Sequence, residues 1–233
     1  MCNLLFVSNL CCLCITMELN RMRHLIAFPP NTSAFILTAF LCAMLSACGY
    51  LIKPHVKLGI INLEKGSYQI DQSHTSVLFK VNHMGMSTFV GRFNSVDASL
   101  AFDPQHMADA KLSALINIAS IDVNNKDLEE SLRGDSWFNA GKYPQAFFTT
   151  TSVQLIDEKR AKFSGNLTLH GITAPIVLDV IFNGGGDNML TGRYTLGFSA
   201  STSFKRSLFG MDYLVPAIGD DVSVDVFAEF QKH

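Results

Sequence analysis

The chain has 233 residues, of which 48% are hydrophobic, and its 18 Lys and Arg against 20 Asp and Glu give a formal net charge of −2. Charges of both signs are interspersed, with no basic stripe to neutralise a phosphate backbone, which argues against nucleic-acid binding. The length beyond the N-terminal region fits one domain, and such a domain can bury a large core without disulfides or metal ions.

The N-terminal region has the layout of an export signal. Basic residues at 21 and 23 precede an apolar stretch, small residues follow at 46–47, and Cys48 is the last of the six cysteines in the chain. This order is typical of a secretory signal. A cysteine directly after the small residues resembles the lipobox of bacterial lipoproteins, which implies cleavage before Cys48 and acylation of its thiol.

The expected organisation follows from that signal. An alternative is a retained membrane anchor over residues 33–47, but this stretch is shorter than the ~20 apolar residues that a spanning helix needs. The predicted parts are a leader over 1–47, with 1–16 an upstream extension if translation starts at Met17 or Met22, a lipidated tether over 48–65, and a barrel domain over 66–233.

From Gly66 onward the hydrophobic pattern has a period of two, which predicts strands with one buried face. The alternating segments are 77–81, 96–102, 112–118, 163–169, 176–182, 190–204 and 222–230. Turn-forming residues separate them at 103–104, 171–175, 183–187 and 219–221. The Gly-rich run 183–187 is predicted to be a hairpin connection, because it lacks the Lys-Ser/Thr of a phosphate loop.

One segment departs from the strand pattern. Residues 125–133 are predicted to form a short helix that Asn124 or Asn125 caps, with Leu128 and Leu132 on one face and Gly134 at its end. Strands joined mostly by short connections, with one helical excursion, indicate an all-β fold, either an antiparallel barrel or a sandwich. Closure into a barrel is favoured because it removes exposed strand edges.

Short motifs occur between about residues 66 and 232 in an order typical of one family. They are Tyr68-x-Ile70-Asp71-x-x-His74-Thr75-x-Val77-x-Phe79, Gly91-Arg92-Phe93, Trp137-Phe138-Asn139, Phe163 to Pro175, Phe209-Gly210 and Gly219 to Val222. These motifs resemble the YceI family, in which Ser often stands where this chain has Thr75. The resemblance implies a lipocalin-like antiparallel β-barrel around an elongated apolar cavity. It also implies an exported protein that binds a polyisoprenoid lipid, of the isoprenoid quinone or prenyl pyrophosphate class.

The alternation selects the side chains expected to face that cavity. A closed barrel of about eight strands can leave room for one small ligand. The expected ligand-binding residues are Phe79, Val81, Ile116, Ile118, Leu167, Leu178, Val180 and Phe198. Because a shift of one residue would turn every side chain outward, this choice depends on the register.

Polar residues suggest less. A metal site needs three or four convergent ligands, so neither a metal nor a cofactor is expected. Asp71 is expected to accept turn hydrogen bonds and His74 to satisfy a buried backbone group, with no catalytic residue. Arg193, Lys205 and Arg206 are expected to form an exposed cluster, the alternative being a head-group site at the barrel mouth. Trp137 and Phe138 are either part of the core or a lid.

The predicted function is therefore an exported lipoprotein that binds or carries a polyisoprenoid lipid, is anchored by acyl chains on Cys48, and faces the periplasm. By resemblance to lipoprotein sorting rules, Gly49 after the cysteine favours the outer membrane in a Gram-negative cell. An envelope stress role follows only from the family resemblance, and a homodimer is left open. Two other classes stay open. In the first, the protein is a non-binding accessory of an envelope complex. In the second it is a lipid-modifying enzyme, which has less support because the sequence contains no nucleophile elbow or zinc signature.

Overall fold

The computed structural model describes residues 56–57 and 63–233, which belong to a compact unit, Pro54–His233. The expected leader, 1–47, and the expected acylation site, Cys48, lie outside the described residues. Among the described residues, no helix is both long and apolar enough to cross a membrane.

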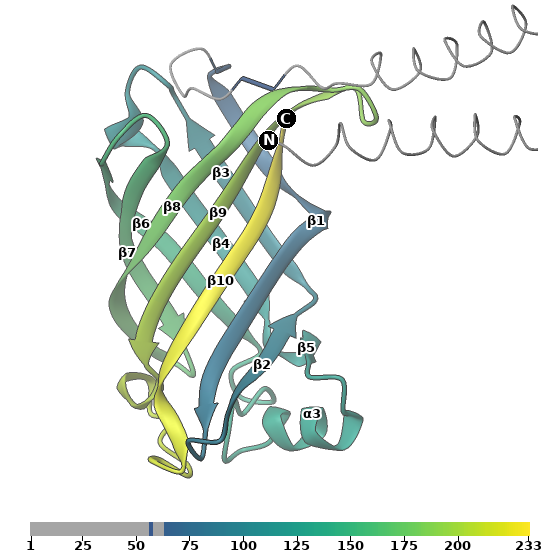
Figure 1. Ribbon diagram of the computed structural model, residues 1–233, viewed down its shortest axis with the longest axis vertical. Helices are drawn as coiled ribbons and strands as arrows, with labels where there is room; N and C mark the ends of the chain where they lie inside the picture. Colours follow the sequence, from purple (N-terminus) through teal and green to yellow (C-terminus); the bar gives the residue numbers. More distant parts are fainter. Residues whose placement is uncertain (1–55, 58–62) are drawn as a thin grey trace, which may run out of the picture. The chain divides into compact units, whose positions relative to one another are not determined.

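The described chain forms a closed antiparallel β-barrel (Figure 1). Its strands are β1 (Gly66–His83), β2 (Ser87–Phe93), β3 (Val96–Phe102), β4 (Lys111–Asn117), β5 (Ile121–Asp122), β6 (Gln145–Leu155), β7 (Arg160–Leu169), β8 (Ile172–Asn188), β9 (Arg193–Lys205) and β10 (Ile218–Lys232). The wall runs in the order β10-β9-β8-β7-β6-β4-β3-β1, and pairing of β1 with β10 closes it. The predicted barrel is confirmed, and the sandwich is not.

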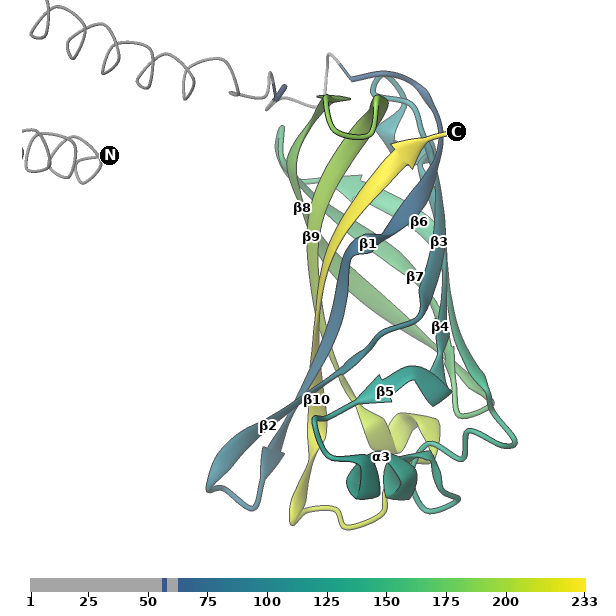
Figure 2. The same ribbon diagram turned by 90° about the vertical axis from the view of Figure 1, so that its right-hand side faces the viewer.

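The long strand β1 takes part in two different pairings on one side. Its first residues pair with β3, and the segment Val77–His83 pairs with β2, while β10 follows it on the other side. Strand β2 therefore branches away from the wall, and the short β5 pairs with β2 (Figure 2). This branch lies at the end of the barrel that also carries the helix.

The predicted helix is confirmed as α3 (Lys126–Arg133). Asn125 is the N-cap, since its side-chain oxygen accepts a hydrogen bond from the Leu128 N–H at 3.1 Å. Acidic residues in the first turn and Arg133 in the last turn match the helix dipole. Three short 3-10 helices complete the described elements: η2 (Met107–Asp109), η3 (Ile118–Ser120) and η4 (Arg206–Phe209).

The Gly-rich run 183–187 is part of strand β8, so its prediction as a hairpin connection is wrong. The connection to β9 lies at 189–192 instead. The glycines serve close packing, because a Cβ at Gly185 would lie 2.6 Å from a methyl carbon of Leu196 and 3.0 Å from one of Leu63. A register shift between Phe182 and Gly184 accommodates the run in the ladder.

Described residues of the expected tether pack against this part of the barrel. Lys57 and Gly185 form an antiparallel bridge with backbone hydrogen bonds of 2.8 and 3.0 Å. Leu63 is only 6% exposed. The packing of the barrel therefore begins before the boundary expected at Gly66.

Candidate functional site

The barrel encloses a cavity of about 460 Å³, within the range of about 300–1,000 Å³ that is usual for ligand sites. Its lining is almost wholly apolar and comes from the eight wall strands together with β2 and the region of α3. The lining includes all eight residues expected from the alternation, namely Phe79, Val81, Ile116, Ile118, Leu167, Leu178, Val180 and Phe198. Their binding of a ligand stays a prediction.

Period-two alternation explains why the lining is so uniform. On β9, the side chains of Phe198, Ala200 and Thr202 line the cavity. The residues between them are serines, and Ser201 is exposed on the outer surface. Opposite them on β10, Val224 and its alternate neighbours also line the cavity. Successive side chains of a strand point to opposite faces, so one parity builds the cavity and the other the outer surface.

One end of the cavity is filled by packed side chains. Tyr68 and Phe102 meet edge to face with ring centroids 6.2 Å apart, and both are buried. Leu196 and Leu63 pack beside them in the same core cluster. Burial raises the pKa of the Tyr68 phenol, whose hydroxyl donates to the Glu64 carbonyl. We call this the closed end; Leu63 and the C-terminal His233 lie there.

Aromatic side chains line the cavity at the opposite end. The Phe138 ring packs against Phe79 and Phe93, with centroids 6.4 and 5.7 Å apart. The Trp137 ring meets Tyr213 edge to face at 5.2 Å. Leu214 lines the cavity and is also 48% exposed, so the cavity reaches the surface beside it. We call this the open end, where Trp137 and Phe138 line the cavity.

Arg206 is buried at the open end and organises the loop that follows η4. Its side chain is part of the cavity lining and only 5% of the residue is exposed. The guanidinium donates to four backbone carbonyls, those of Met211 at 2.6 Å and of Tyr213, Ile218 and Gly219 at 2.9 Å each. Burial lowers the pKa of the guanidinium, and the face of Trp137 lies 5.6 Å away.

The three basic residues expected to cluster do not do so. Arg193 and Lys205 stand at opposite ends of β9. Arg193 donates to Gln231 at 3.3 Å, while Lys205 pairs with Asp221 at 3.2 Å. The expectation of an exposed cluster is wrong, because Arg193 and Lys205 are far apart on β9 and Arg206 is buried. Arg206 follows Thr202 by an even number of residues, so its side chain continues the inward-facing series of β9. That parity was the available signal for its burial.

The few polar members of the lining occur toward the open end. They are His83 at the end of β1, Thr202 on β9 and Arg206. The deeper lining is aliphatic and aromatic. Such a site can take a long apolar tail, with polar contacts available to a head group near the opening.

The Asp71–His74 pair lies outside this cavity. Asp71 accepts hydrogen bonds from Ser73 and Gln231, as expected for a turn acceptor, and hydrogen bonds from Ser73 and His74 lower its pKa to about 2. The role expected for His74 is wrong: its ring is exposed and contacts the Asp71 carboxylate at 2.9 Å. With Glu229 these residues form a cluster whose potential ligand atoms lie within 4.8 Å of one another.

Comparisons with known proteins agree with this architecture. Residues 68–230 match the model of the YceI-like domain. The UPF0312 protein VPA0850 of Vibrio parahaemolyticus is 33% identical over 186 residues, which cover 78% of this chain and 93% of that protein. The crystal structure of Burkholderia cenocepacia BcnA is similar with a TM-score of 0.63 and 23% identity, over 69% of this chain and 98% of that one.

A second solved structure has the same fold. It is a polyisoprenoid binding domain from Saccharophagus degradans implicated in plant cell wall breakdown, with a TM-score of 0.52 and 14% identity. The match covers 73% of this chain and all of that domain. The family match spans most of the barrel and a relative shares a third of its residues, so this chain belongs to the family of proteins with a YceI-like domain.

Proposed function

We propose that the barrel reversibly binds a polyisoprenoid lipid, with the tail in the cavity and the head group near the open end. The observation that carries this proposal is the apolar lining of the cavity, in which the polar members lie toward one end. A tail of branched hydrocarbon gains about 25 cal/mol for each Å² of apolar surface removed from water. The fold shared with the polyisoprenoid binding domain from Saccharophagus degradans supports the same ligand class.

The finer proposal is an isoprenoid quinone or a prenyl pyrophosphate carried by an exported lipoprotein. It rests on the leader, on the lipobox-like Cys48 and on the family, and it includes a place in the cell envelope with the domain facing the periplasm. We propose binding and carriage without a covalent step. The lining is dominated by side chains that cannot act as nucleophile, acid or base.

Native mass spectrometry of the gently purified chain tests the proposal, with a bound polyisoprenoid as the expected result. Ala200→Phe would place a phenyl ring in the cavity, whereas Ser201→Phe would place the same ring outside the barrel. We expect the inward variant to lose at least tenfold in affinity for an added isoprenoid quinone and the outward variant to keep it. Equal retention by both variants, with both folded, would contradict binding in the cavity.

A further inference from the structure

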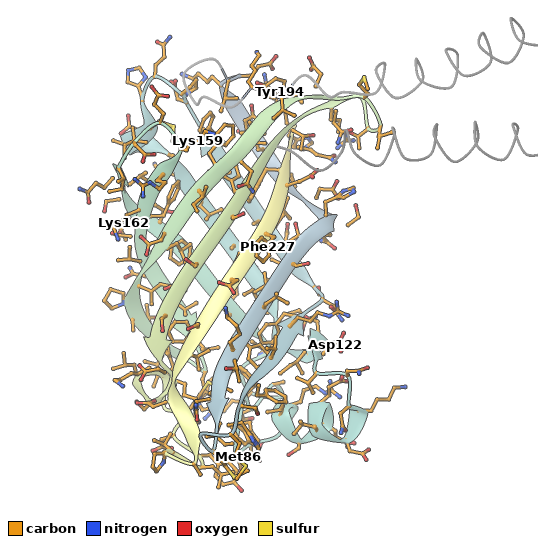
Figure 3. All side chains as sticks on the ribbon, in the orientation of Figure 1. Met86, Asp122, Lys159, Lys162, Tyr194 and Phe227 are labelled. Carbon is orange, nitrogen blue, oxygen red and sulfur yellow. The ribbon has the colours of Figure 1, made fainter. Side chains whose placement is uncertain are left out.

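Exposed apolar side chains surround the open end of the barrel. They come from the turn between β1 and β2, from η4 and from the loop after it, and we call them the mouth rim: Met84, Met86, Leu208, Tyr213, Leu214 and Val215. Met86 is 81% exposed and is labelled in Figure 3 at this end, while Tyr194 is labelled near the other. An apolar set of this size at one place on a surface marks an interaction site.

The segments that carry the rim are depleted in charge. Residues 84–91 contain no Asp, Glu, Lys or Arg, and residues 207–218 contain only Asp212. The connections at the closed end differ: residues 156–160 include four charged side chains, and residues 103–111 include three. Lys159 is labelled toward that end in Figure 3. The connection 189–192 at the closed end is also uncharged, and the helix Lys126–Arg133 near the open end carries several charges, so the depletion is a property of the two rim segments.

The rim is held in place by hydrogen bonds to the barrel. The Met84 N–H donates to the Ala217 carbonyl at 2.8 Å, which joins the two rim segments. Arg206 fixes the second segment from inside through the carbonyls of Met211, Tyr213 and Ile218. The exposed apolar side chains thus belong to an ordered loop, although exposure of such side chains to water is unfavourable.

The rim is also continuous with the cavity. Leu214 belongs to both, and the ring of Tyr213 contacts Trp137, which lines the cavity. A polyisoprenoid is almost insoluble in water, so it passes most readily between a membrane and the barrel if the opening touches the membrane. This expected passage of lipid between membrane and barrel rests on the proposed function.

We propose that the mouth rim is a docking surface for the lipid bilayer, into which its apolar side chains insert to a shallow depth. Binding to a bilayer surface strengthens with the apolar area buried in it, and the rim supplies exposed apolar side chains. Within the two rim segments Asp212 is the one charged side chain, so the surface that they offer to a bilayer is mainly apolar.

Trp137 is the only tryptophan in the chain and lies beside the rim, so all tryptophan fluorescence comes from this end of the barrel. The probe is a vesicle of dibrominated phosphatidylcholine without isoprenoid, whose bromine atoms quench a nearby indole. We expect the full chain to show quenching, and Met86→Asp with Leu208→Asp to need at least tenfold more lipid for the same quenching. The matched control is Met189→Asp with Leu190→Asp at the closed end, where Leu190 is 96% exposed; it should behave as the wild type.

Three outcomes would overturn the docking surface. They are absence of quenching in the wild type, an equal effect of the two double variants, and loss of quenching in Ala200→Phe, which would mean that brominated lipid had entered the cavity. The proposed function is judged separately, with isoprenoid quinone delivered from cyclodextrin instead of vesicles. Binding from cyclodextrin without vesicle quenching overturns only the docking surface, while failure to bind from cyclodextrin overturns the function on which it rests.

Discussion

Replacing Arg206 by Met removes the side chain that holds the loop at the open end. Methionine has a similar length but no donor, so the carbonyls of Met211, Tyr213, Ile218 and Gly219 lose their common partner. The bond to Met211 is buried, and its loss should cost roughly 2–3 kcal/mol. The other three are half-buried and can be rehydrated, at about 0.5 kcal/mol each. The expected loss in free energy of unfolding is therefore about 4 kcal/mol.

Urea unfolding followed by Trp137 fluorescence measures this loss, because the Arg206 guanidinium lies 5.6 Å from the indole ring. Arg206→Lys should lose nearly as much, since an ammonium group cannot reproduce the planar fork that reaches several carbonyls. The control is Arg193→Met at the start of β9, where one exposed contact of 3.3 Å to Gln231 is removed and a change within about 0.5 kcal/mol is expected. A loss below about 1 kcal/mol in Arg206→Met would refute this account of the loop.

Three further changes test other parts of the molecule. Gly165→Ala places a Cβ 2.4 Å from the Phe148 ring and should lower the free energy of unfolding by about 1–3 kcal/mol, whereas Gly141→Ala, with no atom within 4 Å, should not; denaturant titration compares them. His74→Gln should destabilise most between about pH 4 and 6.5, measured by unfolding across pH. Asp71 raises the pKa of His74, so the stabilisation by the ion pair is lost as the pH rises through that raised pKa. The pKa of Asp71 is lowered to about 2, so the same stabilisation is lost as the pH falls from 3.8 toward that value and the carboxylate becomes protonated. A flat pH dependence would contradict the pair. Cys48→Ser should release the protein from membranes but leave isoprenoid affinity unchanged, and loss of both in fractionation and binding assays would show that anchor and site are not separable.

The cavity wall could be predicted from the sequence because strand geometry couples parity to face. Phe198 and its alternate neighbours on β9 are separated by serines, and Leu178 and Val180 are separated by Asp179. In each strand the apolar residues therefore identify the inner face and the polar residues identify the outer face. Wherever one face is apolar and the other polar, the pattern has only one consistent orientation.

The Gly-rich run could not be placed in the same way. Local sequence favours a turn at 183–187, since glycine adopts backbone conformations that other residues avoid. The outcome depends instead on Leu63 and Leu196, which leave no room for a Cβ at Gly185. Contacts between residues so distant in sequence have no local signature, so a turn and a tightly packed strand cannot be distinguished there.

The open end was also beyond prediction, for a related reason. Alternation along β9 marks Arg206 as inward, but a buried cation requires partners, and these are backbone carbonyls of residues 211–219. Every residue has a backbone carbonyl, so the residue types in the sequence do not indicate which carbonyls will accept these hydrogen bonds. The mouth rim could not be predicted from the sequence either, because Met86 and Leu214 are brought to one end of the barrel by a long-range contact, the hydrogen bond from the Met84 N–H to the Ala217 carbonyl.

The chain enters the barrel at the closed end, whereas the mouth rim lies at the open end, and this arrangement limits how an anchored barrel can face a membrane. The chain joins the barrel at the closed end, through the Lys57 bridge to Gly185 and the buried Leu63. An acyl anchor at Cys48 would be connected to that bridge by residues 49–56, which span at most about 30 Å when fully extended. The 13 residues of β9, tilted as in other barrels, give the wall a height of roughly 33 Å. A barrel standing with its closed end toward the membrane would therefore hold its mouth away from that membrane, whereas a barrel lying against the membrane would bring the rim into contact with it. The anchor would then keep the barrel near the bilayer, and the apolar rim would determine which part of it touches the lipid.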